Sequence, residues 1–388
     1  MPTPQQPSIA QLFISFLRLG VTAFGGPSMV VYIRKMAVEQ KGWLDADVFD
    51  DGVALCQMIP GATAMQTAAY VGLKSRGVIG AGASFIGFGL PAFLLMMVFA
   101  AAYTYTRNLS IVISAFSGLQ AIIVAIVANA MFMFGRKTLK NWKLVLLAAG
   151  AAALFGLNIN PILVILFAAV SGLVLVKTRP AIARLSMPAG RTTPTFRQLL
   201  ILLSLFSLVL VPLYFFRRNL FDLSISLVRI DLMAFGGGFA SVPLMFHEIV
   251  EIRGWLDSQT FMNGIVLGQV TPGPIVITAT FIGYLLDGVL GGLVATVSIF
   301  MPSFALVVGI TPYYERLRRL PLFYKVVDGV LCSFVGFLFT VTIRFALNVH
   351  WDWTHFLLAL AAFVALRLKV DILWVILLGT LASIILIL

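Results

Sequence analysis

The stretch Arg18-Leu-Gly-Val-Thr-Ala-Phe-Gly-Gly26 returns 211 residues later as Arg229-Ile-Asp-Leu-Met-Ala-Phe-Gly-Gly237. Three further blocks return in the same order, at offsets of 211 or 212 residues. They are Gly42-Trp-Leu-Asp45 with Gly254-Trp-Leu-Asp257, Gln57-Met-Ile-Pro-Gly61 with Gln269-Val-Thr-Pro-Gly273, and Leu90-Pro-Ala-Phe93 with Met301-Pro-Ser-Phe304. Four matching blocks in one order predict that the chain contains an internal repeat.

The composition excludes a water-soluble globule. Of 388 residues, 60% are hydrophobic and 11% are charged, with a mean hydropathy of +1.02. A soluble domain carries about a quarter charged residues. Apolar windows recur along the whole chain, and most approach the ~20 residues that a bilayer crossing needs. We therefore expect an all-α polytopic membrane protein.

The chain divides into about 13 apolar segments. They span residues 9–33, 52–73, 78–103, 111–134, 144–157, 161–176, 198–216, 223–246, 261–286, 289–310, 326–347, 353–366 and 372–388. The fifth and twelfth are short and could form re-entrant hairpins with their successors. The even-numbered connections hold eighteen Lys and Arg and the odd-numbered ones hold six. The positive-inside rule then predicts a cytoplasmic N-terminus and an outside C-terminus.

The repeat is predicted to be inverted, because seven segments separate the starts of the two copies and an odd number reverses the second copy in the bilayer. This symmetry is typical of secondary transporters. We expect a first repeat over 1–177, a basic Pro-rich linker with a connecting helix over 178–218, and a second repeat over 219–388. The same counting predicts Trp43 outside and Trp255 at the cytoplasmic face.

Two apolar segments in each half are interrupted by Gly and Pro, which disfavour helix. Each break begins a new helix, whose N-terminus presents unpaired N–H groups and about half a positive charge. Broken backbone at this depth is tolerated where protein buries it or water reaches it. We predict an anion site where the four breaks meet, although single Gly or Pro residues more often kink or pack helices. The residues are Phe24, Gly25, Gly26, Pro27, Gln57, Pro60, Gly61, Phe235, Gly236, Gly237, Gly238, Gln269, Thr271, Pro272 and Gly273.

Two arginines precede the Phe-Gly-Gly breaks by six residues and are predicted to bind substrate. Arg18 and Arg229 lie deep enough that exposure to lipid would cost at least ~2.5 kcal/mol. Asp231 could instead pair with Arg229, whereas Gly20 occupies the matching position in the first half. The candidates for proton coupling are Asp231, Glu248 and His247.

The remaining features argue against several classes of protein. Lys plus Arg outnumber Asp plus Glu by 27 to 15, and no acid occurs between Asp51 and Asp222. Loops facing the cytoplasm and anionic lipid headgroups explain most of this basicity, so no nucleic-acid partner is implied. Two isolated cysteines, scattered histidines and the lack of a Walker loop imply no metal, cofactor or enzyme activity. Assembly into a homo-oligomer stays open.

The doubled Phe-Gly-Gly, Gly-Trp-Leu and Gln-x-x-Pro-Gly pattern resembles the long, two-domain members of the chromate ion transporter (CHR) family, over nearly the whole chain. The resemblance implies an inner-membrane transporter that exports chromate, confers chromate resistance and has sulfate as a competing analogue. A dianion leaving a cell that is negative inside gains about 4.6 kcal/mol per 100 mV, so export needs no ATP. Proton antiport is a further expectation. The alternatives are a sulfate or phosphate transporter, an anion channel and a membrane-embedded reductase.

Overall fold

The fold is helical in every part of the chain that the computed structural model describes, which is residues 6–24, 28–176, 196–314 and 320–387. The α-helices are α1 (Ile9–Thr22), α2 (Ser28–Arg34), α3 (Ala46–Met58), α4 (Thr63–Thr106), α5 (Ser110–Thr138), α6 (Trp142–Gly156), α7 (Pro161–Leu175), α8 (Phe196–Phe216), α9 (Arg218–Met233), α10 (Gly238–Met245), α11 (Ser258–Val270), α12 (Thr278–Ile310), α14 (Pro321–Asn348), α15 (Trp353–Arg367) and α16 (Ile372–Ile387). The π-helices η1 (Lys35–Gln40) and η2 (Phe246–Ile252) extend α2 and α10, and short 3-10 turns are η3 (Ile275–Ile277) and η4 (Thr311–Tyr313).

Four helical stretches in these ranges are long and apolar enough to cross a membrane. They are Thr63–Thr106, Ser110–Thr138, Ile275–Tyr313 and Leu322–Asn348. Six shorter apolar helices accompany them. The expectation of an all-α fold is confirmed for the described residues, and the set of apolar helices indicates a multi-pass membrane protein.

Helix α4 consists of two helices that fold back on each other. The turn is at Gly77, whose φ of +63° is favourable for glycine. On either side of it, Gly72 and Gly80 lie so close that a methyl group on Gly72 would come within 2.2 Å of the Gly80 carbonyl oxygen. The first arm therefore covers 63–75 and the returning helix covers 78–106.

Helix α12 has the same construction in the second half. Gly288 has a φ of +56°, and a methyl group on Gly283 would lie 2.2 Å from the Gly291 carbonyl oxygen. The first arm covers 278–286 and the returning helix covers 289–310. Small residues at the contact allow the two arms of each pair to pack backbone against backbone.

Helix α3 and the first arm of α4 form a helical hairpin. The Tyr70 hydroxyl donates to the Val48 carbonyl oxygen at 3.2 Å, which joins the start of α3 to the end of the arm. At the other end, the Thr63 hydroxyl lies 3.5 Å from the Cys56 carbonyl oxygen. The chain reverses at residues 59–62, which we call the tip of this hairpin.

The second half contains the corresponding hairpin, made of α11 and the first arm of α12. A methyl group on Gly264 would lie 2.5 Å from the Phe281 ring, and the Thr278 hydroxyl lies 3.5 Å from the Gly264 carbonyl oxygen. Its tip is residues 271–277.

The helices before and after each Phe-Gly-Gly motif also run in opposite directions. Ser15 on α1 and Lys41 after η1 line one groove, so α1 and the α2–η1 helix run side by side in opposite directions. In the second half, the Ser226 hydroxyl on α9 donates to Glu248 on η2 at 2.8 Å.

These hairpins change one expectation from the sequence. Segments 9–33 and 52–73 are predicted to be spans that break near the midplane, whereas the structure divides each into two shorter helices that run in opposite directions. Hydropathy does not distinguish the two cases, because both bury a continuous apolar stretch. A helix of 13 residues such as α3 is only about 20 Å long, against about 30 Å of hydrocarbon.

The ends of the hairpins in each half gather at one place. In the first half, the Arg76 side chain donates to the Pro7 carbonyl oxygen at 2.6 Å. In the second half, the matching contact is between Arg217 and Asp287 at 3.4 Å. Each contact joins the start of the first hairpin to the turn that follows the second.

The two sets of hairpins come from opposite ends of the molecule. The returning helix of α4 carries Tyr103 to the second half, where its hydroxyl accepts a hydrogen bond from Asn263 of α11 at 3.1 Å. The returning helix of α12 carries Phe304 to the first half, where its ring lies 5.1 Å from that of Phe85 and joins a buried cluster with Leu55 of α3. The two long helices therefore run in opposite directions past each other.

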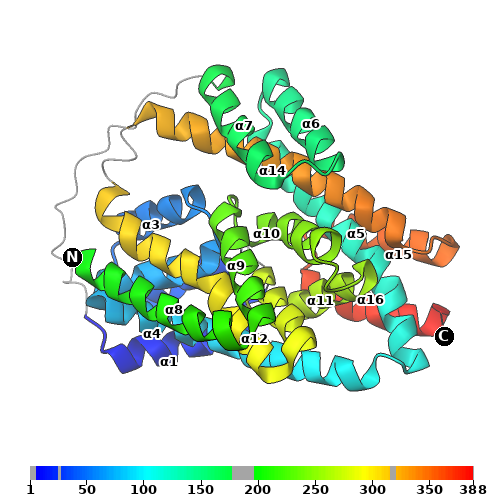
Figure 1. Cartoon of the computed structure of the whole chain (residues 1–388), viewed down its shortest axis with the longest axis horizontal. Coiled ribbons are helices and arrows are strands. Elements are labelled where there is room, and N and C mark those ends of the chain that lie inside the picture. Colours follow the sequence, from blue (N-terminus) through cyan, green and yellow to red (C-terminus); the bar gives the residue numbers. More distant parts are fainter. Residues whose placement is uncertain (1–5, 25–27, 177–195, 315–319, 388) are drawn as a thin grey trace.

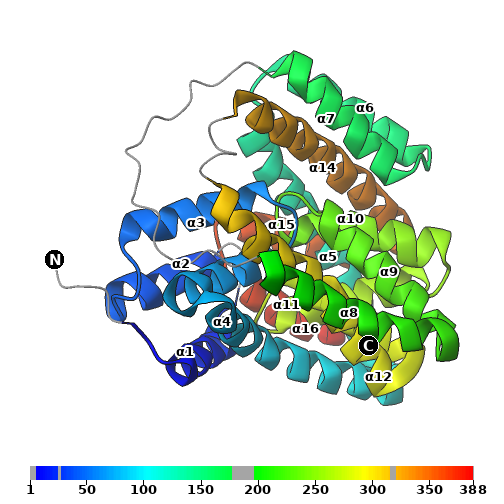
Figure 2. The ribbon, with the colours of Figure 1, turned by 60° about the vertical axis from the view of Figure 1, so that its left-hand side comes forward.

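The last helices of each half pack against the other half. Helix α14 lies beside α6 and α7 in both views (Figure 1, Figure 2), and α5 contacts α15 and α16. Glycines make both contacts close: a methyl group on Gly329 would lie 2.4 Å from the Ala168 carbonyl oxygen, and the Gly118 N–H donates to the Ser383 hydroxyl at 3.1 Å. This exchange ties the two halves into one core.

Candidate functional site

The tips of the two halves are joined by a pair of crossed hydrogen bonds. The Gly61 N–H donates to the Ala234 carbonyl oxygen at 3.0 Å, and the Gly273 N–H donates to the Ala23 carbonyl oxygen at 3.2 Å. Each bond connects the Pro-Gly tip of one half to the residue before the Phe-Gly-Gly break of the other. The Pro-Gly tip of each half therefore contacts the end of the helix that precedes the Phe-Gly-Gly motif of the other half.

Glycine is required at these tips by both conformation and space. Gly61 and Gly273 have φ values of +113° and +130°, which L side chains rarely adopt. A methyl group on Gly61 would lie 2.0 Å from the Ser303 hydroxyl, and one on Gly273 would lie 2.7 Å from the Ala92 methyl. Ala92 and Ser303 are equivalent residues of the two copies, so the two tips pack against equivalent positions of the long returning helices.

A cavity of about 350 Å³ lies between the tips, and we call it the tip cavity. Its lining combines the starts of α2 and α4 from the first half with the tips of the second half and the end of α5. Six predicted site residues line it: Gln57, Gly236, Gly237, Gly238, Gln269 and Gly273.

The tip cavity is suited to an anion. Lys137 of α5 is the one charged residue of its described lining. The side-chain nitrogen of Gln269 is buried and has no hydrogen-bond partner among the described residues. Helices α4 and α10 begin here at Thr63 and Gly238, and their N-cap residues, Ala62 and Gly237, provide no side-chain cap in the described structure. An ionised oxygen ligand would satisfy these donors and the partial positive charge of both helix ends.

The other predicted residues of the breaks fall into two groups. Gly25, Gly26 and Pro27 lie outside the described residues. The described residues of the breaks that do not line the cavity are Phe24, Pro60, Gly61, Phe235, Thr271 and Pro272. The Thr271 hydroxyl donates to the Gly268 carbonyl oxygen of its own helix at 2.8 Å, which leaves it unsuited to hold substrate.

The structure does not bring the two predicted arginines to the tip cavity. Arg18 lines a groove between α1 and η1, and Arg229 lines a groove between α9 and η2. Both side chains are on the outer faces of their helices and are exposed. Their predicted contact with substrate in the centre is not supported by this placement.

Asp231 contacts Ser303 and not Arg229. It is completely buried and accepts a hydrogen bond from the Ser303 hydroxyl at 2.8 Å. Residues two positions apart on a helix are separated by about 200° around its axis. Arg229 therefore lies on the face opposite to Asp231. Ser303 in turn accepts a hydrogen bond from the Ala62 N–H at 3.0 Å, so Asp231 is linked to the tip of the other half.

The other two proton-coupling candidates, Glu248 and His247, line the groove between α9 and η2. Glu248 accepts hydrogen bonds from Ser226 and Arg253, and His247 contacts Glu251 at 2.8 Å. Neither belongs to the lining of the tip cavity. In the described structure, both side chains pair with neighbouring residues.

Lys137 is the site residue that the sequence analysis missed. It belongs to the basic cluster 136–143, which the positive-inside count assigns to a connection. The structure continues α5 to Thr138, so Lys137 lies in the last turn of a long helix. Phe134, three residues earlier on the same helix face, also lines the cavity.

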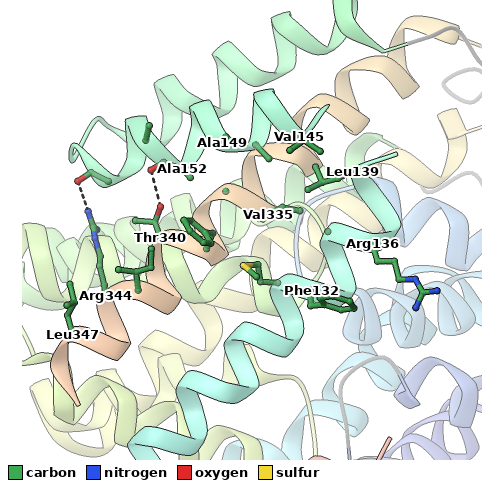
Figure 3. A pocket seen from close by; sticks show the side chains of 18 residues that line it. Phe132, Arg136, Leu139, Val145, Ala149, Ala152, Val335, Thr340, Arg344 and Leu347 are labelled. Carbon is green, nitrogen blue, oxygen red and sulfur yellow. Dashed lines mark hydrogen bonds between the residues drawn. The ribbon is translucent and has the colours of Figure 1, made fainter. Parts of the chain in front are cut away.

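A larger hollow of about 1040 Å³ lies between α5, α6 and α14, and its lining is mostly apolar, with Arg136 and Arg344 as its charged residues. Figure 3 shows its lining, which is mostly aliphatic, with Thr340 and Arg344 hydrogen-bonded to the end of α6. Such an apolar groove on a membrane protein matches lipid chains. The tip cavity, whose lining is more polar, is the better candidate for an oxyanion site.

Comparison with known proteins identifies the class and then the family. The chain matches the model of a membrane transporter family twice, over residues 10–173 and 221–384, and that family is described as chromate transporter. The chain belongs to the chromate transporter family, in its long, two-domain form. This is a family of transporters and not of enzymes.

Several relatives align over almost the whole chain. An uncharacterized transporter of Methanocaldococcus jannaschii is 40% identical over 98% of this chain and 94% of its own length. A chromate transport protein of Cupriavidus metallidurans is 31% identical over 93% of this chain and 88% of its own length. A probable chromate transport protein of Synechococcus elongatus is 28% identical, covering 92% and 90%. No solved structure matches the chain.

Proposed function

We propose that this protein is a secondary transporter that exports chromate, or another tetrahedral oxyanion such as sulfate, through the tip cavity. The unpartnered buried nitrogen of Gln269, beside Lys137 in a cavity between uncapped helix ends, is the observation that carries the proposal. The described lining contains hydrogen-bond donors and no carboxylate, which favours an anion over a cation. The name chromate comes from the relatives that bear it in their descriptions.

The two copies act as inverted-topology repeats, bounded at 1–177 and 219–388 with a linker and connecting helix between them. The crossed hydrogen bonds between tips and the opposite approach of the two hairpin sets support this symmetry. Substrate sites of such transporters lie at the repeat interface near the bilayer midplane, formed by discontinuous helices.

The N-terminal face is cytoplasmic in this proposal and the C-terminus is outside, in the inner (plasma) membrane. The hairpin geometry places Arg34, Lys35 and Lys41 on the same side as the N-terminus, together with Lys74 and Arg76. The hairpins therefore gather these basic residues at one face of the membrane. The positive-inside rule makes this face cytoplasmic. Outward movement of a dianion then gains about 4.6 kcal/mol per 100 mV.

The hairpins reverse the predicted positions of the loops that carry Trp43 and Trp255. We expect Asp47→Cys to be cytoplasmic and Gln259→Cys to be outside; the two positions are equivalent and exposed. A membrane-impermeant thiol reagent added to intact cells should label only Gln259→Cys. Labelling of Asp47→Cys alone would restore the single-crossing topology. The unmodified chain, whose two cysteines are buried, measures the background.

Proton coupling is proposed to involve Asp231. Its carboxylate is held by Ser303, which also binds the Ala62 N–H at the tip of the other half. Protonation of Asp231 would change the hydrogen bonds that Ser303 makes and thereby the packing of the tip of the first half. Asp231→Asn is then expected to fold and to lose the response of transport to a pH gradient.

Transport by inside-out membrane vesicles tests the proposal. We expect uptake of labelled chromate that saturates, is accelerated by an inside-positive potential and is inhibited by sulfate. Vesicles without the protein are the control. Flux that does not saturate and shows no counter-flow would indicate an anion channel, and transport of sulfate without chromate would make sulfate the substrate.

A further inference from the structure

The groove between α1 and η1 is rich in positive charge. It has a volume of about 450 Å³, and we call it the first groove. Three cations, Arg18, Lys35 and Lys41, line it with the hydroxyl groups of Ser15 and Tyr32. No carboxylate belongs to its lining in the described part of the chain. Glu39, on the same π-helix, pairs instead with Arg34 at 2.9 Å.

The second half has an equivalent groove of about 360 Å³ between α9 and η2, which we call the second groove. Each lining position of the first groove has its counterpart in the second, at offset 211 before the break and 212 after it. Ser15 corresponds to Ser226, and Lys41 corresponds to Arg253. The second groove is completed by the loop between α6 and α7.

The second groove contains its own anion. The Glu248 carboxylate accepts a hydrogen bond from Ser226 at 2.8 Å and another from the Arg253 side chain at 2.9 Å. Both donors are charged or hydroxyl groups that a free oxyanion would also use. Both hydrogen bonds go to Oε1 of Glu248, so this atom shows where one oxygen is bound in a groove of this shape.

The first groove has Met36 at the position of Glu248. The backbone confirms the correspondence, because the Lys41 N–H donates to the Met36 carbonyl oxygen and the Arg253 N–H donates to the Glu248 carbonyl oxygen. Met36 is buried and carries no charge. The first groove therefore keeps the donors of the second groove and lacks the carboxylate that satisfies them.

We infer that the first groove is a second oxyanion-binding site, in which a ligand oxygen takes the place that the Glu248 carboxylate has in the second groove. Ser15 and Lys41 would hold that oxygen, and Arg18 with Lys35 would supply the remaining charge. The ligand is an oxyanion with at least one negative charge, either free in solution or the phosphate of a lipid headgroup. The inference does not depend on substrate binding in the tip cavity.

Binding of labelled sulfate to the purified full-length protein in detergent tests this inference. We expect Met36→Glu to bind one sulfate fewer than the unmodified protein, because the new carboxylate occupies the site. Met36→Gln has the same size without the charge and should keep that sulfate. Lys137→Gln should remove a different sulfate, from the tip cavity, so that failure of the proposed function is seen separately.

Arg18→Gln provides a second variant whose side chain is exposed and whose fold is not at risk. It should weaken the affinity for the same sulfate about tenfold or more, since a charged donor is lost. Added phosphatidylglycerol, compared with phosphatidylcholine, distinguishes the two sources of the ligand. Displacement by phosphatidylglycerol alone supports a lipid phosphate, and no displacement supports a free oxyanion. Equal sulfate binding by the unmodified protein, Met36→Glu, Met36→Gln and Arg18→Gln would overturn the inference.

Discussion

Replacement of Lys137 by Glu should raise the KM for chromate by at least about a hundredfold. Lys137 is the one charged residue of the described cavity lining. A hydrogen bond to a charged group contributes about 1.5 to 3 kcal/mol, and each 1.4 kcal/mol is a factor of ten. Loss of the charge in Lys137→Gln should therefore cost about 10- to 100-fold, and reversal in Lys137→Glu adds repulsion of the dianion.

Lys140→Glu is the matched control for this prediction. Lys140 is exposed and three residues further along the chain, but it does not line the tip cavity. Transport kinetics in proteoliposomes, expressed per folded molecule, compare the two variants at equal net charge. Equal effects of Lys137→Glu and Lys140→Glu would mean that Lys137 acts only through the charge of the surface.

Much of the site could be predicted because its signals are local in the sequence. Gly and Pro inside apolar segments mark broken helices, and the repeat pairs each break with a partner. Gln57 and Gln269, which are equivalent, were found in this way, and both line the tip cavity. The direction of the chain after each break could not be predicted, because a turn and a kink use the same residues.

Helix periodicity explains why the arginines were misplaced. On α1 the buried residues Leu12, Phe16 and Gly20 recur every four positions, so they share one face. Arg18 is two positions from Phe16 and from Gly20, which puts it on the opposite face. Its depth in an apolar segment was read correctly as a sign of a polar partner or groove, but the direction in which it points follows from the buried stripe.

The same rule applies to the difference between the halves at Gly20 and Asp231. Both positions face the long returning helix, and a methyl group on Gly20 would lie 2.4 Å from the Phe88 carbonyl oxygen. In the second half, the corresponding space holds a carboxylate bonded to Ser303. The two halves are therefore alike in backbone and unlike in polarity at these equivalent positions, which gives the tip of the first half a titratable neighbour.

Gly61→Ala should abolish transport together with most of the folded protein. A non-glycine residue at a φ of +113° is strained by about 1 to 2 kcal/mol, and the new methyl group would lie 2.0 Å from the Ser303 hydroxyl. The displaced Ser303 would release both the Ala62 N–H and Asp231, which leaves buried polar groups unpaired at about 1 to 3 kcal/mol each. Together these costs are a large part of the stability of a typical domain.

Gly82→Ala on the returning helix of α4 is the control, because a methyl group there meets nothing within 4 Å. It should retain folded yield, measured by size-exclusion chromatography, and transport per folded molecule. The double variant Gly61→Ala with Ser303→Gly removes the overlap with Ser303, while the backbone strain and the unpaired Ala62 N–H and Asp231 remain. If Gly61 acts by seating the tip against the other half, the double variant should recover part of the folded yield. If the glycine instead provides the surface that touches substrate, the double variant would fold and still fail to transport, and the seating role would be rejected.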